Sequence, residues 1–270
     1  MPVRLSVVSQ KGGAGKTTVV LNLGLALAKR HRVLIVDLDP QGGIALSLAK
    51  PDQAWAGLAE LLMGSASIDQ AIIQTKEGNL SILSRGRLDP ADVCEFELAL
   101  HQEGALGRVL ADVEKGYDFV LIDTPAGMGM IPRAALQVTN FAMVTFQAEP
   151  LAMRSIGQVL RVIERVKADE NPQLELVGIL PTMVDAENQS SKTALWTMWS
   201  GMQGVLDNHI PRSDVFSKAS EVGIPIAFLG GPSRPEVRRF DALAVEVENI
   251  IDRFTPKETE EPEGAYRELV

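Results

Sequence analysis

Ten consecutive residues near the start of the chain have the chemistry to bind a phosphate group. They read Ser9-Gln10-Lys11-Gly12-Gly13-Ala14-Gly15-Lys16-Thr17-Thr18. Glycines let backbone N–H groups turn inward around an anion, and a helix that begins there points its positive end at the same place. The Lys16 ammonium would reach the β- and γ-phosphates, and the Thr17 hydroxyl would bind Mg²⁺. A glycine-rich turn without a ligand is the weaker interpretation.

A second lysine, Lys11, lies in the same loop, and Gln10 occupies the place of the usual first glycine. Two lysines 4 Å apart would repel each other by up to ~4 kcal/mol at an effective dielectric constant of 20. The pair is tolerable only if Lys11 points away from Lys16, or if an anion of about four negative charges compensates both.

Carboxylates follow two apolar runs at which strands are expected. Asp37 and Asp39 come after 33–36, and Asp123 comes after 119–122. Residues i and i+2 share one side of an extended segment, and ligands of open α/β sheets bind at the carboxyl ends of the strands. An aspartate in that position can hold Mg²⁺ or a water bound to it. The alternatives are an ordinary turn at Asp39-Pro40 and a plain buried strand before Asp123.

The loop with its extra lysine resembles the deviant Walker A motif of the ParA/MinD family of P-loop ATPases. In that family the extra lysine reaches the ATP of a partner subunit, so the resemblance implies a homodimer that forms on ATP binding. It also implies that Asp39 positions the attacking water, although Gly43 replaces a usual asparagine. The implied catalytic residues are Lys11, Lys16, Asp39 and Asp123. The implied Mg²⁺ ligands are Thr17, Asp37 and Asp123, and the implied phosphate-binding residues are Lys11, Gly12, Gly13, Ala14, Gly15, Lys16, Thr17 and Thr18.

Two later segments, 182–185 and 210–213, resemble family segments that lie near the adenine base. By that resemblance Met183, Pro211 and Ser213 would contact the base, and ATP with Mg²⁺ would be the cofactor. The resemblance covers about residues 3–254 and is closer to ParA than to MinD. It further implies weak intrinsic ATP hydrolysis that an activating partner protein with a basic N-terminal segment stimulates.

Apolar runs alternate with helical patterns along the chain, which predicts one α/β domain over residues 1–254. Most runs are apolar throughout, as in strands of a doubly wound, mostly parallel sheet with helices on both faces. The expected strands are 3–8, 33–36, 80–83, 119–122, 141–146, 176–180 and 224–228. The expected helices include 17–29, 105–114, 153–167 and 191–206. Residues 255–270 are acidic and are expected to be a disordered tail.

The composition excludes several classes of protein. The chain has 270 residues, 46% of them hydrophobic and 23% charged, with a net charge of −9 and a single cysteine, Cys94. One cysteine excludes a disulfide framework, a cysteine-rich zinc site and an iron–sulfur cluster ligated within one chain. Neither a signal peptide nor an apolar stretch of about 20 residues stands out, so a cytoplasmic protein is expected.

Three functional classes compete. One is a ParA-like switch that binds DNA without sequence specificity, so that the protein would associate with the nucleoid. Another is a MinD-like switch that binds membrane and positions a cell-division or other assembly. The third, a metabolic or electron-transfer relative, is disfavoured by the lone Cys94 and by the absence of length for a substrate domain.

The last helical pattern bears on the membrane interpretation. Its apolar residues are Phe240, Leu243, Ala244, Val247, Ile250, Ile251 and Phe254. The polar face carries Asp241, Glu246, Glu248 and Asp252, which anionic lipids would repel. We therefore expect this helix to pack on the sheet and the membrane to be an unlikely partner.

The DNA interpretation depends on Arg234, Arg238 and Arg239, which cluster just before that helix. They are the DNA-binding candidates, and the alternative is an ordinary solvated surface. Glu187 counts against DNA, because many partition ATPases carry an arginine there. A stripe of Trp196, Trp199 and Met202 is expected in the core or in a partner contact.

Overall fold

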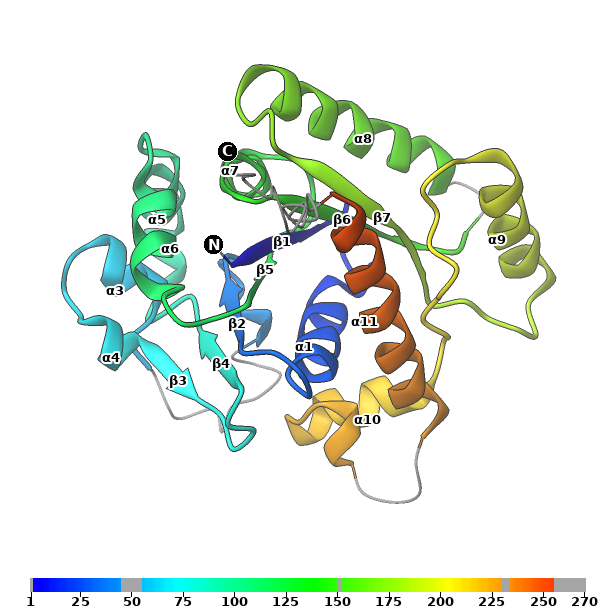
Figure 1. Cartoon of the computed structure of the whole chain (residues 1–270), viewed down its shortest axis with the longest axis horizontal. Helices are drawn as coiled ribbons and strands as arrows, with labels where there is room; N and C mark the ends of the chain where they lie inside the picture. Colours follow the sequence, from blue (N-terminus) through cyan, green and yellow to red (C-terminus); the bar gives the residue numbers. More distant parts are fainter. Residues whose placement is uncertain (1, 45–54, 150–151, 230–233, 255–270) are drawn as a thin grey trace, which may run out of the picture.

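A seven-stranded sheet forms the centre of the computed structural model, which describes residues 2–44, 55–149, 152–229 and 234–254 (Figure 1). The strand order is β3-β4-β2-β5-β1-β6-β7, and every neighbouring pair is parallel except β3 with β4. The strands are β1 (Val3–Val8), β2 (Val33–Asp37), β3 (Ile72–Gln74), β4 (Leu80–Leu83), β5 (Phe119–Asp123), β6 (Phe141–Gln147) and β7 (Glu175–Thr182). The predicted fold class, a doubly wound and mostly parallel sheet, is confirmed.

Helices cover both faces of the sheet. They are α1 (Lys16–Leu27), α3 (Leu58–Leu62), α4 (Ile68–Ala71), α5 (Val93–His101), α6 (Ala105–Val113), α7 (Met130–Val138), α8 (Ala152–Asp169), α9 (Gln189–Gly201), α10 (Asp214–Val222) and α11 (Pro235–Phe254). Short 3₁₀ turns lie at Pro90–Asp92 and Ile226–Phe228.

Alternate residues of each central strand enter separate hydrophobic clusters. On β2, Val33 and Ile35 pack with α1 and α11, whereas Leu34 and Val36 pack with the helices around α6 and α7. All five residues of β2 are buried. Burial on both faces explains why the strands are apolar throughout rather than alternating.

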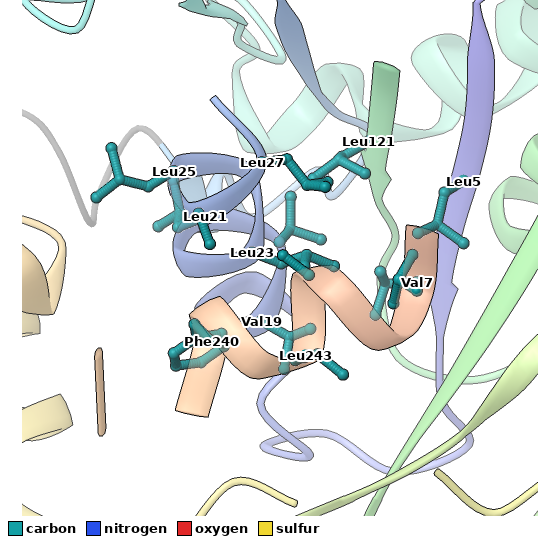
Figure 2. Close-up of a cluster of buried hydrophobic side chains, with 14 of the residues drawn as sticks. Leu5, Val7, Val19, Leu21, Leu23, Leu25, Leu27, Leu121, Phe240 and Leu243 are labelled. Atoms are coloured by element: carbon teal, nitrogen blue, oxygen red, sulfur yellow. The ribbon is translucent and has the colours of Figure 1, made fainter. Parts of the chain in front are cut away.

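Helix α11 packs against α1 on one face of the sheet (Figure 2). Phe240, Leu243, Ala244, Val247 and Ile251 are buried, so the expected apolar stripe does face the core. Phe254 remains 47% exposed, but its ring lies 5.8 Å from that of Phe141, centroid to centroid. The expectation that this helix packs on the sheet is confirmed.

Several expectations from the sequence are wrong in detail. Residues 224–228 form no strand but a 3₁₀ turn, since Pro225 cannot donate to a strand ladder and the Ile226 amide bonds to Asn22 Oδ1 instead. The helix expected over 191–206 ends at Gly201, because Val205 and Leu206 return to pair with Ile179 of β7. The short antiparallel β3 was not predicted.

Three further expectations concern the periphery. Trp196 is 71% exposed and Trp199 39% exposed, so neither is a core residue, although the Trp199 ring contacts that of His209. Arg238 and Arg239 lie within α11 rather than before it, and only Arg234 precedes the helix. The acidic tail at 255–270 falls outside the described residues.

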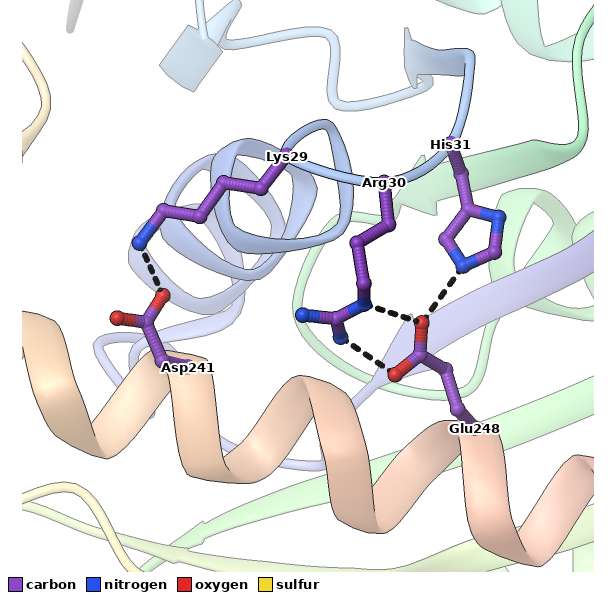
Figure 3. A network of polar contacts seen from close by, with 5 residues as sticks. All are labelled: Lys29, Arg30, His31, Asp241 and Glu248. Carbon is purple, nitrogen blue, oxygen red and sulfur yellow. Dashed lines mark hydrogen bonds and ion pairs between the residues drawn. The ribbon is translucent and has the colours of Figure 1, made fainter.

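Polar contacts tie the C-terminal end of α1 to α11 (Figure 3). Lys29 pairs with Asp241 at 2.5 Å, and Arg30 and His31 both contact Glu248, at 2.5 and 2.6 Å. Burial raises the pKa of the Glu248 carboxyl, but hydrogen bonds from Arg30 and His31 outweigh it and lower the pKa below its ordinary value. Charged Glu248 therefore stabilises the packing of α11.

Replacing Glu248 with glutamine should lower the free energy of unfolding by about 1–2 kcal/mol near neutral pH, because it removes the charge that accepts hydrogen bonds from Arg30 and His31. A carboxyl with a lowered pKa in the folded state stabilises the protein above its ordinary pKa, and that contribution is lost as the pH falls through the lowered value. Urea unfolding should thus show a difference from wild type that narrows with acidification. Glu164→Gln, at an exposed position of α8, is the control and should change little. A Glu248→Gln difference that is equal at neutral and acidic pH would contradict the charged role.

Candidate nucleotide and magnesium site

The loop between β1 and α1 has the backbone shape that its glycines predict. Gly13 and Gly15 have φ angles of 71° and 80°, in the left-handed region that side chains rarely adopt, and Gly15 is the N-cap of α1. Ala14 is buried, and its carbonyl oxygen lies 3.0 Å from Thr182 Oγ1 of β7. This loop therefore presents the N-terminus of α1 at the carboxyl edge of the sheet, where an anion would meet backbone N–H groups.

Lys16 lies beneath this loop and is only 7% exposed. Its Nζ donates to Ser9 Oγ over 3.3 Å. Burial lowers the pKa of Lys16, while the charges of Asp123 and Asp39 act in the opposite direction. A buried ammonium with one neutral partner has donors left for an anion such as a phosphate.

Thr17 and Asp123 meet at the ends of α1 and β5. The Thr17 hydroxyl donates to Asp123 Oδ2 over 2.6 Å, and Asp123 Oδ1 is buried with no hydrogen-bond partner. Burial raises the pKa of Asp123 to about 7, although the Thr17 hydrogen bond and the Lys16 charge lower it. A cation beside these two oxygens would satisfy the unpartnered atom and favour the charged carboxylate.

Asp37 lies opposite Asp123 in the register of β2 and β5, and both side chains are completely buried. Burial raises the pKa of Asp37 well above its ordinary value, and the nearby Asp123 charge raises it further. Its oxygens accept from the backbone N–H groups of Asp39 and Ile44, at 3.0 and 3.2 Å. Asp37 thus holds the loop after β2 in place, and its role as a Mg²⁺ ligand stays a prediction.

Two contacts of this region, at Gly43 and at Arg85, were not expected from the sequence. A Cβ atom added at Gly43 would lie 3.0 Å from Thr17 Oγ1, so glycine lets the loop approach that hydroxyl closely. Arg85, which follows β4, donates to the Pro40 carbonyl and also to the Leu88 carbonyl, the latter over 3.3 Å. The sequence around Arg85 carried no signal for this contact.

The predicted Mg²⁺ site has few protein ligands. Within the described residues, no group of three or more His, Cys, Asp or Glu side chains could hold a metal ion. Thr17 and Asp123 supply oxygen ligands, the kind that Mg²⁺ prefers, and Mg²⁺ in nucleotide sites commonly completes its shell with phosphate oxygens and water. These residues fit a magnesium ion that arrives with a phosphate ligand.

Lys11 and Lys16 have different partners, and the Lys11 side chain is about half exposed. Its Nζ lies 3.6 Å from Glu149 Oε2, a carboxylate in the segment after β6, and both side chains are nearly half exposed. A carboxylate of its own is compatible with the first of the two arrangements expected for the second lysine, in which it is directed to a group other than the anion at Lys16. The ammonium lies at the surface, where a second molecule can reach it.

A pocket of 540 Å³ opens beside the loop. Its lining residues are Gln147, Ala148, Glu149, Met183, Asp185, Asn188, Ser190, Ser191 and Arg212. Met183 has a φ of 51°, and it alone among the described non-glycine residues has a positive φ. Residues held in such sparsely populated conformations cluster at ligand and active sites, so Met183 marks this pocket as a candidate binding site.

The three residues predicted to contact a base do not all reach this pocket. Met183 lines it, but Pro211 and Ser213 do not. Pro211 pairs with Val184 in an isolated bridge, and the Ser213 hydroxyl caps α10 and lies 2.8 Å from Glu236 Oε1. Arg212, between them, lines the pocket instead.

The arginines predicted to bind DNA lie at the start of α11. Arg238 and Arg239 are exposed, and Arg234 is half-buried. Lys218 on α10 is exposed as well. In the described parts of the chain, no helix is long and apolar enough to cross a membrane.

Comparison with known proteins agrees with this site. A family model described as an AAA domain matches residues 4–176. The chain is 33% identical over 235 residues to the chromosome partitioning protein ParA of Caulobacter vibrioides, which covers 83% of this chain and 86% of that protein. It is 31% identical over 242 residues to the sporulation initiation inhibitor protein Soj of Bacillus subtilis, with 85% and 92% of the chains covered.

Solved structures show the same fold. A structure described as cobyrinic acid a,c-diamide synthase of Mycobacterium smegmatis, with bound ATP analogue and magnesium, has a TM-score of 0.78 and 31% identity. The match covers 97% of this chain and all of that one. The expectation that this chain is too short to be such a synthase is therefore wrong. The cell division ATPase MinD of Pyrococcus furiosus has a TM-score of 0.75 and 26% identity, over 93% of this chain and all of that one. By its family model, its relatives and its fold, the chain belongs to the ParA/Soj/MinD family of P-loop ATPases.

Proposed function

We propose that this protein is a ParA-type switch that binds ATP with Mg²⁺, dimerises in that state and hydrolyses ATP slowly. The observation that carries the proposal is the buried contact between Thr17 and Asp123 beside Lys16, with one carboxylate oxygen left unpartnered. The ATP analogue and magnesium in the mycobacterial structure support the same ligands here.

Each residue of the site has a distinct role in this proposal. Lys16 and the loop N–H groups hold the phosphates, while Thr17 and Asp123 bind the magnesium ion, which neutralises phosphate charge when bound. Asp39, after β2, orients the attacking water. The base occupies the pocket beside Met183. Asp123 is assigned to the magnesium ion and Asp39 to the water, so no residue among those described is left to act as a separate general base, and fast hydrolysis would need an activating partner protein.

Dimer formation depends on Lys11 in this proposal. Its ion pair with Glu149 is exposed on both sides, and such pairs contribute about 0–1 kcal/mol. Exchange of Glu149 for the phosphates of a second subunit's ATP would therefore cost little. A highly charged anion is the stronger partner for an ammonium.

DNA is the proposed partner of the dimer, and membrane is the alternative. The exposed arginines of α11 would double in number across a two-fold axis, which strengthens binding to a polyanion without new kinds of contact. The membrane alternative would need the apolar side of α11, but that side is buried against α1 and the sheet. The cargo would be a chromosome, a plasmid or a protein assembly.

Replacing Lys16 with alanine should weaken ATP binding by at least tenfold, because charge-assisted hydrogen bonds to phosphate are each worth about 1.5–3 kcal/mol. Isothermal titration calorimetry with ATP and Mg²⁺ measures the change. Lys11→Ala is the matched control and should keep monomer affinity near wild type. Equal ATP affinity for Lys16→Ala and wild type would refute the nucleotide site.

ATP, and not ADP, should drive formation of the dimer. In an Asp39→Ala background, which should bind ATP without hydrolysing it, light scattering should give twice the monomer mass with ATP. Adding Lys11→Ala to that background should restore the monomer, whereas adding Glu149→Gln should leave the dimer intact. A dimer that survives Lys11→Ala would remove the role of this lysine between subunits.

The variant with Arg234, Arg238 and Arg239 all changed to alanine should dimerise with ATP but lose DNA retention. For wild type, about six neutralised phosphates would give a slope of log K against log salt near −5, with no dependence on DNA sequence. Anionic liposomes serve as the second ligand in the same assay. Capture by liposomes and not by DNA would favour the MinD-like alternative. Unchanged DNA retention by the triple variant would mean that these arginines do not bind DNA.

A further inference from the structure

A groove of 390 Å³ runs along the outer side of α11. Ala242, Val245 and Asn249 line it along the helix, and Asp207 and Asn208 line it from the loop that precedes Pro211. Val245 is 46% exposed, so this stretch of α11 has no covering element among the described residues. The groove offers space for an extended segment of chain.

The two ends of this groove differ in what lies next to them. Arg253 lines one end and is followed by Phe254, where the described chain stops and residues 255–270 begin. Ala242 lines the other end, one helical turn after Arg238 and Arg239. At 1.5 Å per residue, Arg238 lies ~24 Å from Phe254 along the helix.

The segment 255–270 is acidic and long enough to cover that distance. It carries Glu258, Glu260, Glu261, Glu263 and Glu268 against Lys257 and Arg267. Glu263 comes nine residues after Phe254, which corresponds to a span of up to ~30 Å for extended backbone. The last two glutamates can therefore reach Arg238 and Arg239.

Several other cations of the chain are already engaged. Arg30 pairs with Glu248, Arg32 with Asp118, and Lys167 with Glu175. By contrast, Arg253 at one end of the groove and Arg238 and Arg239 beyond the other end make no ion pair with any described residue. The first glutamates of the segment can therefore meet Arg253, and the later ones can reach Arg238 and Arg239. The Glu246 carboxylate within the groove accepts from the backbone N–H groups of Asp207 and Asn208 and from Asn208 Nδ2, so its charge is partly compensated.

We propose that residues 255–270 lie back along this groove and hold their glutamates against Arg238 and Arg239. Because the segment is tethered to α11, its effective concentration at the arginines is in the millimolar range, enough for a weak contact to be populated. DNA phosphates would then compete with the segment for the same cations. This inference rests on the proposed DNA binding, which the segment would inhibit.

DNA binding by three forms of the protein, with ATP and Mg²⁺ at low salt, tests the competition. The forms are the full chain, a chain that ends at Phe254, and a full chain with Glu260, Glu261, Glu263 and Glu268 changed to glutamine. Both altered forms should bind DNA about three- to tenfold more tightly, since a surface that the segment occupies 70–90% of the time binds with an apparent Kd raised by that factor.

A matched control separates this contact from general charge repulsion. Glu77, Glu95, Glu103 and Glu164 are exposed residues outside the segment, and changing all four to glutamine removes the same number of charges. The control should tighten DNA binding by less than twofold. Equal tightening by the control and by the altered segment would overturn the proposal.

A second measurement does not depend on DNA. A nitroxide at Ala265→Cys, in a Cys94→Ser background, should broaden the amide resonances of residues 238–249 in the full chain, and the four glutamine changes should remove that effect. Broadening confined to residues beside Phe254 would overturn the contact. If no form binds DNA, the proposed DNA function fails, and the nitroxide result still decides whether the segment occupies the groove.

Discussion

The contact between Thr17 and Asp123 is the interaction on which the rest of the site depends. Two completely buried carboxylates, Asp37 and Asp123, lie opposite each other, with the buried Lys16 nearby. Burying a charge costs several kcal/mol unless other groups compensate it. Backbone N–H groups and the Thr17 hydroxyl provide part of that compensation, and the unpartnered oxygen of Asp123 is an acceptor that a cation would satisfy. A site of this kind is incomplete without its ligand.

The sheet topology creates this concentration of charge. Because β5 lies between β2 and β1, the carboxyl ends of three parallel strands meet at one edge. Helix α1 starts at that edge and must lie close to the sheet to bring Thr17 to Asp123. Gly24 permits this approach, since a Cβ atom there would lie 2.8 Å from Ile35 Cδ1. Close packing of α1 on the sheet therefore fixes the position of its N-terminus relative to the ends of the strands.

Helix α11 connects this centre with the periphery. Its apolar side completes the core over α1, and its acidic residues hold the end of α1 through Lys29, Arg30 and His31. The acidic side that argued against membrane binding is therefore partly occupied within the molecule. The remaining exposed surface carries the arginines and the groove, so one helix serves both the packing of the nucleotide domain and the proposed regulation.

The sequence by itself determined those features that depend on local chemistry. Runs that are apolar throughout predicted six of the strands to within two residues at either end. Glycines followed by a lysine and a threonine predicted the loop before α1. Asp37 and Asp123 were recognisable because each ends an apolar strand. These patterns are local, since burial and backbone conformation act on neighbouring residues.

Only the tertiary structure decided the features that join distant segments. Arg85 reaches Pro40, Glu149 reaches Lys11, and Gly43 lies against Thr17, each across a gap that no local pattern encodes. The strand expected at 224–228 and the helix end expected at Leu206 failed for the same reason, because Asn22 and Ile179 supply the competing hydrogen bonds. A residue departs from its local secondary-structure preference where a partner far along the chain forms a better hydrogen bond with its backbone. Such a partner can be identified only in the folded structure.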